Sequence, residues 1–349
     1  MSSHMLRGQS DIQSIHDLVD RLEHESSPSL RGALAIAKHP GRREWTKQPP
    51  TLQEGTASAL ATGPATAPGD IACDSRGAPA LGSTVVDLDE LLLIPAVRAA
   101  TRLWRHGGRV VAFALVDPYN NLGFDIDPDH TSPQLEAAIV DWGVACLRKR
   151  NAESGEEGTL DASCSADNAA RIALLDRHGF IRESLRTLDY ARSLVAPIPD
   201  HPLPQGLSLR SVRGEQEVEA LVALHRAAFG TDHMTVDGRL AIMRAPQYEP
   251  EMDLLAVAPN GELAAFCICG FDDPGRTVGY TDPIGTHARY QRQGLGRAIV
   301  TAGLHALRDR GATTAELGTS SENVAMQRLA EALGFRVVSE SVWLSRAVD

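Results

Sequence analysis

The stretch Gln291-Arg292-Gln293-Gly294-Leu295-Gly296 joins a segment with strand-like alternation, 277–286, to a segment with helical periodicity, 294–310. The first turn of a helix has backbone N–H groups without intrahelical acceptors and a partial positive charge, so it binds phosphate well. Gly294 and Gly296 carry no Cβ, so the backbone can approach an anion closely. The stretch therefore predicts a phosphate-binding turn at the start of a helix.

The residues around this turn indicate which kind of ligand it binds. Arg289, Arg292 and Arg297 place positive charge around it in an otherwise acidic chain, which favours an anionic ligand. The turn has neither the third glycine of the dinucleotide fingerprint nor the Gly-Lys-Ser/Thr of the Walker loop, so neither nucleotide motif applies. An ordinary tight turn is the alternative, because an isolated Gly-x-Gly is common.

Strand and helix patterns alternate on both sides of the turn. The second half of the chain predicts strands at 207–212, 252–258, 262–271, 277–286, 314–318 and 335–344, and helices at 215–229, 294–310 and 323–333. The first half repeats part of this order, with helices at 11–25, 133–148 and 168–177 and a strand at 109–116. The repetition predicts an α/β (α+β) fold class, with helices and strands alternating along the chain. The protein is predicted to consist of two duplicated halves.

Proline content divides the chain. Four prolines fall within 197–204, a density that no helix or central strand tolerates. This predicts a linker at 197–205, between a first domain at 6–196 and a second domain at 206–349. Within the first domain, a stretch rich in Gly, Pro and Ala predicts a flexible insertion near 38–83.

Composition excludes several classes of protein. The formal net charge of −11 argues against a nucleic-acid partner, because phosphate backbones require clustered Lys and Arg. The same charge favours a cationic substrate, or merely keeps the protein soluble. No apolar run reaches the roughly 18 residues of a membrane span, and residues 1–5 are too short and polar for a secretory signal. The five cysteines have neither metal-ligand nor disulfide spacing, so we expect no metal site and a cytoplasmic location.

The turn and two neighbouring elements resemble the GNAT acetyltransferase superfamily. Its signature Gln/Arg-x-x-Gly-x-Gly/Ala, between the fourth strand and the third helix, is met by the glutamine and both glycines of 291–296. The segment 323–335 is similar to the family's asparagine-started helix that ends in Leu-Gly-Phe, and 279–287 resembles its splayed fourth strand. The resemblance covers about 206–349 and implies a mixed, mostly antiparallel central sheet flanked by helices.

The first half carries a second copy of one of these elements. The asparagine-to-Gly-Phe pattern recurs at 168–180, so the resemblance implies two tandem GNAT folds. The counterpart of the cofactor turn, 127–134, contains no glycine. Its two aspartates would repel phosphate, and Thr131 or Ser132 can cap the helix that follows, filling the anion position. The first domain is therefore predicted to be a degenerate GNAT domain that has lost cofactor binding.

The resemblance implies acetyl-CoA as cosubstrate. Its pyrophosphate would lie on the backbone amides of the turn, and its pantetheine arm would pair with the fourth strand like an added strand. Asn323 would contact the cofactor near the thioester, and it can also cap its own helix. The residues implied for cofactor binding are Ile284, Gly285, Thr286, Gln291, Arg292, Gln293, Gly294, Leu295, Gly296, Arg297, Asn323 and Met326.

The resemblance also implies direct transfer, in which a neutral amine attacks the thioester while strand amides stabilise the oxyanion. The family's usual base is an acid on the fourth or fifth strand. Asp282 is the first candidate and Glu316 the second; a turn residue before a proline and a surface ion pair are their respective alternatives. Many members have a tyrosine as general acid where this chain has Ala330. Either a thiol of pKa about 8.5 leaves unaided, or another residue supplies the proton.

The predicted function is N-acetyl transfer to the primary amine of a small molecule. Asp232 and His233 lie where the family's substrate loop is found and are candidates for substrate contact, although an exposed loop without a role is the alternative. Transfer of another acyl group, or to a protein amine, is a second enzymatic interpretation. A non-catalytic acyl-CoA-binding or interaction module is the rival from a different class. The sequence predicts no oligomeric state.

Overall fold

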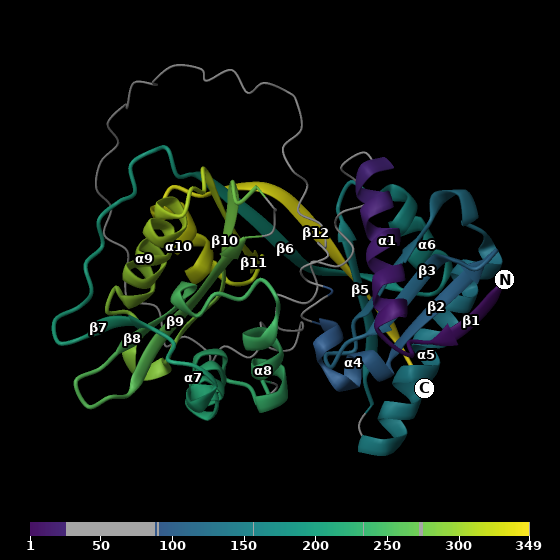
Figure 1. Cartoon of the computed structure of the whole chain (residues 1–349), viewed down its shortest axis with the longest axis horizontal. Coiled ribbons are helices and arrows are strands. Elements are labelled where there is room, and N and C mark those ends of the chain that lie inside the picture. Colours follow the sequence, from purple (N-terminus) through teal and green to yellow (C-terminus); the bar gives the residue numbers. More distant parts are fainter. Residues whose placement is uncertain (26–87, 89–90, 156, 233, 272–274, 349) are drawn as a thin grey trace.

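The computed structural model describes residues 1–25, 88, 91–155, 157–232, 234–271 and 275–348. The insertion predicted near 38–83 lies outside these residues. Figure 1 shows two halves beside each other, with the long strands β6 (Ile181–Ser193) and β12 (Arg336–Ala347) running between them. Within the described part of the chain, no helix is long and apolar enough to cross a bilayer.

The two halves repeat one order of elements. The first half contains β1 (Ser2–Met5), α1 (Gln9–Glu25), α4 (Pro95–Ala99), β2 (Thr101–His106), β3 (Arg109–Val116), β4 (Leu122–Ile126), α5 (Pro133–Ser154), β5 (Thr159–Ser165), α6 (Ala169–Arg177) and β6. The second contains β7 (Ser208–Ser211), α7 (Val218–Phe229), α8 (Val236–Arg244), β8 (Asp253–Val257), β9 (Leu263–Phe271), β10 (Val278–Thr286), α9 (Leu295–Asp309), β11 (Thr314–Ser320), α10 (Val324–Ala332) and β12. The helices and strands predicted from sequence are confirmed, with α5, β11 and β12 ending later than expected. The patterns did not reveal β1, β2, β4, β5, α4 or α8.

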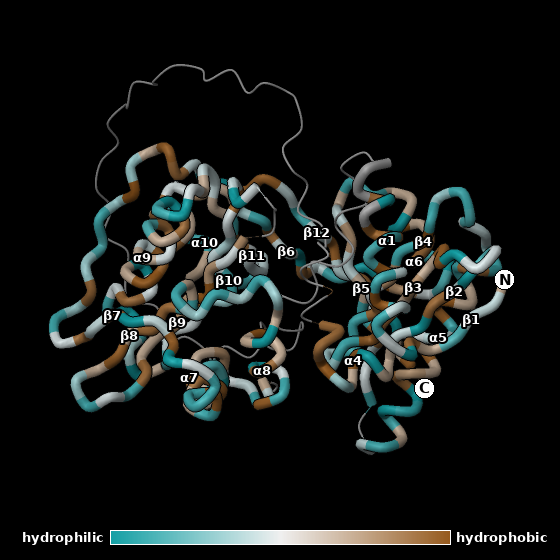
Figure 2. The backbone as a smooth tube through the Cα atoms, in the orientation of Figure 1, coloured by the Kyte–Doolittle hydropathy of each residue, from teal (hydrophilic) through white to brown (hydrophobic). Residues whose placement is uncertain are grey.

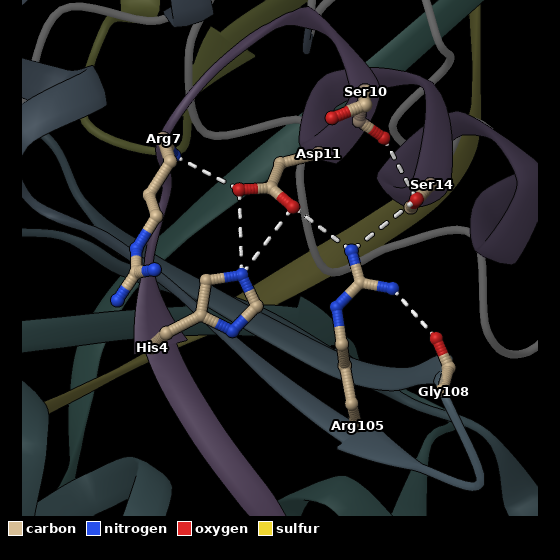
Figure 3. A network of polar contacts seen from close by, with 7 residues as sticks. All are labelled: His4, Arg7, Ser10, Asp11, Ser14, Arg105 and Gly108. Carbon is tan, nitrogen blue, oxygen red and sulfur yellow. Dashed lines mark hydrogen bonds and ion pairs between the residues drawn. The ribbon is translucent and has the colours of Figure 1, made fainter.

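Strand β1 lies before the boundary predicted at residue 6 and belongs to the fold. It pairs antiparallel with β2, and a polar network joins both strands to α1 (Figure 3). Asp11 accepts hydrogen bonds from the backbone N–H of Arg7 at 2.9 Å and from Arg105 Nη2 at 2.8 Å, and lies 3.3 Å from His4 Nε2. Burial alone would raise the pKa of Asp11, but these partners lower it below its ordinary value. A short polar edge strand has no periodic signal, so only the pairing reveals it.

The halves share one continuous sheet, with strand order β5-β12-β6-β11-β10-β9-β8-β7. Strand β6 of the first half pairs with β11 of the second, while β12 of the second half pairs with β5 of the first. Strands β6 and β12 also pair with each other. Strands β1 to β4 form a neighbouring sheet, which approaches β5 through the parallel bridge Asn121↔Asp161. Each half therefore completes its sheet with the last strand of the other half.

The exchanged strands also exchange core side chains. Leu188 and Tyr190 of β6 lie in the hydrophobic core of the second half. Val342 and Leu344 of β12 lie in the core of the first half. The proline-rich segment 197–204 forms neither helix nor strand, as predicted, but it joins two chain segments whose cores depend on each other.

One carboxyl group on β6 is buried where this strand pairs with β12. Asp189 accepts a hydrogen bond from Ser339 Oγ of β12 at 2.6 Å and is 5% exposed. Burial raises the pKa of Asp189 to about 6, although the serine bond lowers it. Because this pKa exceeds the ordinary value of 3.8, the folded protein holds a proton that the unfolded chain loses as the pH rises above about 4. The free energy of unfolding therefore decreases as the pH rises from about 4 to about 6, and stays lower above that window.

We expect Asp189→Asn to stabilise the protein at pH 7.5, because the amide has no ionisation to suppress. The gain is at most about 3 kcal/mol, at 1.36 kcal/mol for each unit of pKa shift, and it should shrink toward zero at pH 4.5. Thermal unfolding at the two pH values measures it. The exposed Asp141→Asn on α5 is the matched control and should change little at either pH. An effect of Asp189→Asn that is equal at both pH values would contradict this account.

Candidate functional site

A cavity of about 550 Å³ lies between the end of β10, the start of α9 and α10; we call it the turn cavity. It contains every residue predicted for the cofactor except Gln293, whose Nε2 donates to the Arg289 carbonyl at 3.3 Å. The lining residues are Ala228, Phe229, Ile284, Gly285, Thr286, Tyr290, Gln291, Arg292, Gly294, Leu295, Gly296, Arg297, Asn323, Ala325, Met326, Arg328 and Leu329. The structure thus brings two segments about thirty residues apart to one concave surface.

The start of α9 is open to a ligand. Gly294 precedes the helix in the left-handed conformation, with φ of 84°, and no side chain caps the first turn. A Cβ on Gly296 would lie 3.0 Å from Leu329 Cδ1, so glycine lets α9 lie close to α10 there. The first N–H groups of the helix have no intrahelical acceptors. They therefore provide donors for an anion at the mouth of the turn cavity.

The charged side chains that line the turn cavity are all positive. Arg292, Arg297 and Arg328 line it, and no Asp or Glu is present among the described lining residues. Arg289, which precedes the turn in sequence, is instead paired with Glu262 at the edge of β9. Three guanidinium groups beside a helix N-terminus suit a ligand that carries several phosphates.

Strands β10 and β11 part next to this cavity. They pair in parallel from Val278↔Thr314 to Tyr280↔Glu316, and no paired residues follow, although both strands continue. The predicted splay of the fourth strand is therefore present. Backbone groups of β10 beyond this point face a gap, where an extended ligand arm can add like a strand. Asn323 caps α10 by accepting from the Met326 N–H at 3.1 Å, and it lines the turn cavity as well.

A second cavity, of about 460 Å³, lies between the two halves; we call it the interface cavity. Its first-half wall comes from α4 and the loop after β3, and its second-half wall from α7, α8, β9 and β10. Figure 2 shows strongly hydrophobic chain at α4, where it faces α8. The lining residues are Leu91, Ile94, Pro95, Ala96, Asp117, Pro118, Tyr119, His225, Met234, Thr235, Asp237, Gly238, Ala241, Ile242, Ile268, Tyr280, Asp282 and Pro283.

The interface cavity has the opposite charge. Asp117, Asp237 and Asp282 line it, and no Lys or Arg does so within the described residues. Asp117 is held by the loop that it begins, accepting from the backbone N–H groups of Tyr119 and Asn121 at 2.8 Å each. Burial raises the pKa of Asp117 to about 6, against the lowering effect of these bonds. Apolar walls with several carboxyl groups suit a ligand with an apolar body and a positive charge.

Helix α8 is held against the sheet by a buried ionic contact. Arg239 of α8 pairs with Asp253 of β8, and Tyr248 Oη donates to the same carboxylate at 2.7 Å. Both members of the ion pair are almost fully buried. Removing one partner would leave an uncompensated buried charge, so the pair fixes the wall that α8 gives to the interface cavity.

The predicted catalytic acids lie on the face of the sheet toward the interface cavity. Asp282 lines that cavity directly. Glu316 is buried and pairs with Tyr280, another lining residue, so its side chain is on the same face of the sheet. Ala330, at the position of the missing tyrosine, is fully buried in the core of the second half.

The predicted substrate loop contributes less than expected. Asp232 is exposed and lines neither cavity, and His233 lies outside the described residues. The next residues, Met234 and Thr235, do line the interface cavity. His225, Asp237 and the first-half residues were not among the predicted site residues. Asp237, an acidic residue in the first turn of α8, is a weak sequence signal for a site. Nothing in the sequence indicates which loop of the first half faces the second half.

Comparisons with known proteins agree with this geometry. The model of the acetyltransferase (GNAT) family matches residues 218–335, which contain α7, the turn and α10. A mycothiol acetyltransferase of Salinispora arenicola is 35% identical over 202 residues, 55% of this chain and 65% of that protein. Another, of Thermobispora bispora, is 32% identical over 213 residues, 58% of this chain and 66% of that protein. The chain thus matches slightly less than two thirds of the length of these relatives.

Solved structures show the same fold. A tandem GNAT protein from the clavulanic acid biosynthesis pathway has a TM-score of 0.58 at 18% identity, covering 78% of this chain and 90% of that one. A GCN5-related N-acetyltransferase from Sphaerobacter thermophilus has a TM-score of 0.57 at 20% identity, covering 71% and 81%. Family model, relatives and fold agree with the splayed strand and the open glycine turn: residues 218–335 match the acetyltransferase (GNAT) family, and the chain has the fold of GNAT proteins.

Proposed function

We propose that the protein is an acetyl-CoA-dependent N-acetyltransferase that acts on the primary amine of a small molecule. The observation that carries this is the pair of cavities with opposite charge. The turn cavity has three arginines and an uncapped helix N-terminus, which suit the phosphates of acetyl-CoA. The interface cavity has three carboxyl groups and no Lys or Arg among its described lining residues, which suits an amine. The small volume and the name of the relatives favour a small molecule over a protein amine.

The proposed reaction is direct transfer. The amine nitrogen bonds to the thioester carbon, the carbon–sulfur bond breaks, and the electron pair leaves with the CoA thiolate. Asp282 accepts the proton that the nitrogen loses, directly or through water, because it is the acid that lines the interface cavity. Glu316, on the same face but not among the lining residues, acts at longer range. The thiolate needs no dedicated acid, since a thiol has a pKa of about 8.5.

Asp282→Asn is expected to lower kcat/KM by about 100- to 10,000-fold, the usual contribution of a general base. The affinity for acetyl-CoA should stay within a few fold, because Asp282 does not line the turn cavity. Thiol release measured with a chromogenic thiol reagent gives the rate, and calorimetry gives the affinity. Glu316→Gln is the comparison and should cost less. A larger loss in Glu316→Gln than in Asp282→Asn would reverse the assignment of the base.

The proposal includes one cofactor site per chain, in the second half. In the first half, the start of α5 is closed by its own side chains. Asp127 accepts from the Asp129 N–H at 3.1 Å and from Arg109 Nη2 at 2.6 Å. Ser132 caps the helix by accepting from the Leu135 N–H at 3.2 Å. Ser132 therefore occupies the position at which α9 presents free amides, and Asp127 adds negative charge one turn before it.

The slot beside this turn is also filled in the first half. Asn168 and Asn323 both cap their helices, and three residues later the first half has Arg171 where the second has Met326. Arg171 Nη2 donates to the Phe124 carbonyl at 2.6 Å and to Asp125 Oδ1 at 2.9 Å. A buried guanidinium group therefore takes the carbonyl acceptor and the space that a pantetheine arm would need, which supports a single site.

A screen of acceptors tests the proposed function. Purified protein and acetyl-CoA are mixed with tyramine, glucosamine, spermidine or a peptide with a free N-terminus, and thiol release is followed. We expect turnover with at least one small amine and none above background with the peptide. Peptide turnover alone would support a protein acyltransferase instead. Tight acetyl-CoA binding without turnover of any amine would support the non-catalytic binding module.

A further inference from the structure

The imidazole ring of His225, in the wall of the interface cavity, has a nitrogen without a hydrogen-bond partner among the described residues. His225 of α7 lines the cavity and is 5% exposed. Its Nδ1 is buried, and no hydrogen-bond partner for it is present among the described residues. An unpaired buried polar atom costs about 1–3 kcal/mol. Such an atom in the wall of a binding cavity points to a ligand that pairs with the ring.

Aromatic neighbours fix the plane of this ring. The His225 ring is stacked on Phe266 of β9, with centroids 5.7 Å apart and planes 27° apart. It also contacts Phe229, one helical turn later on α7, at a centroid distance of 4.6 Å. Both neighbours pack against the ring and restrict its rotation.

The ring is held neutral. Burial lowers the pKa of His225 to about 3, and the nearby Arg239 and Arg226 lower it in the same direction. A neutral imidazole has one nitrogen that donates a hydrogen bond and one that accepts. It cannot take a proton from an ammonium group near neutral pH, so its role is recognition rather than acid–base chemistry.

The ring also lies between the two cavities. His225 lines the interface cavity, and its contact Phe229 lines the turn cavity. The thioester must reach from one cavity to the other, so a group bound at His225 is close to the point of transfer. Around the ring the wall is mostly apolar, with Ile268, Ala241 and Met234 among its members. A hydrocarbon amine could cover this wall, but it would leave the imidazole unpaired.

We propose that His225 is a specificity-determining residue that selects amines which also carry a hydroxyl group, by hydrogen bonding that hydroxyl to its neutral imidazole. This inference rests on the proposed function of the interface cavity. The carboxyl groups of the cavity attract the ammonium end of the acceptor, and the imidazole forms a hydrogen bond with its hydroxyl group. A site built to pair with a substrate hydroxyl discriminates strongly against an analogue that lacks it, because its own polar group is then left unpaired.

Matched pairs of amines test this role in the full-length protein. Tyramine is compared with phenethylamine, and glucosamine with cyclohexylamine, as acceptors for the wild type, His225→Phe and His225→Gln. We expect the wild type to prefer the hydroxylated member by at least about 10-fold in kcat/KM for a pair that is turned over. His225→Phe keeps the stacked ring but has no nitrogen, so the ratio should fall to about one. His225→Gln, which restores a donor and an acceptor, should recover part of the preference.

Two further measurements separate the possible failures. Thermal unfolding and calorimetric titration with acetyl-CoA establish that both variants are folded and bind the cofactor. A wild type without preference, or a His225→Phe variant that keeps the full preference, overturns the role of His225. Turnover of no amine at all, with acetyl-CoA binding intact, overturns the proposed function itself and this inference with it.

Discussion

The variant Gly294→Glu, Gly296→Glu is expected to lose acetyl-CoA binding, from one site per chain in the wild type to none detectable by calorimetry. Both substitutions put a carboxylate at the start of α9, where the phosphates would accept hydrogen bonds from the backbone. A side chain at 294 would also have to adopt φ near 84°, which disfavours any residue with a Cβ. At 296 a Cβ would contact Leu329 at 3.0 Å. The affinity loss combines charge repulsion with a blocked approach, so we expect at least about 1,000-fold, or 4 kcal/mol.

The matched control is Gly261→Glu, Gly311→Glu. Both glycines also have positive φ, 84° and 101°, with open space where a Cβ would lie, and neither lines a cavity. This control adds the same charge and comparable backbone strain, so it should bind acetyl-CoA like the wild type. Two sites per chain in the wild type would contradict a closed first-half slot. Unchanged binding by the turn variant would contradict the assignment of the turn cavity.

A chain shortened to residues 197–349 is expected to be unfolded and to bind no acetyl-CoA, although it contains every residue of the turn cavity. It lacks β6, which supplies Leu188, Tyr190 and the following Leu194 to the core of the second half. Burial of each such side chain contributes about 1.5–3 kcal/mol, so the loss approaches the 5–15 kcal/mol that stabilises a typical domain. Strand β11 would also lose its backbone partners. Circular dichroism and calorimetry measure both effects.

A chain of residues 180–349 is the control, since it regains β6 and its contacts with β11 and β12. We expect it to recover helical and strand signal and to bind acetyl-CoA, with a lower Tm than the full chain, because Val342 and Leu344 lose their core partners. Equal folding and binding by 197–349 and 180–349 would mean that the second half does not need the exchanged strand.

Much of the second half follows from local sequence. The glycine turn, the amphipathic helix after it and the asparagine-capped helix near the end are each specified by residues adjacent in the chain. Their physics is local, because a helix cap, a positive φ and a 3.6-residue periodicity involve only neighbouring residues. For that reason the structure places nearly all predicted cofactor residues around one cavity, and Gln293 alone points elsewhere.

The helices and strands that the sequence patterns did not reveal are those with a weak periodic signal. Strands β2, β4 and β5 are buried on both faces over much of their length, so they show no clean alternation. Helix α4 has five residues, too short for a clear helical period. The prediction for Asp232 rests on its position in the chain alone, and its side chain is exposed.

What the sequence determined by itself is therefore the resemblance to the GNAT family, the glycine turn at the start of α9 and the repeat of two halves, because each depends on residues close together in the chain. Only the tertiary structure decided that β6 and β12 exchange partners and that the first half closes the interface cavity. A strand that completes its own sheet and one that completes its neighbour's have the same alternation of side chains. Pairing partners are chosen by packing between residues far apart in sequence, such as Asp189 and Ser339, and that choice leaves no local pattern.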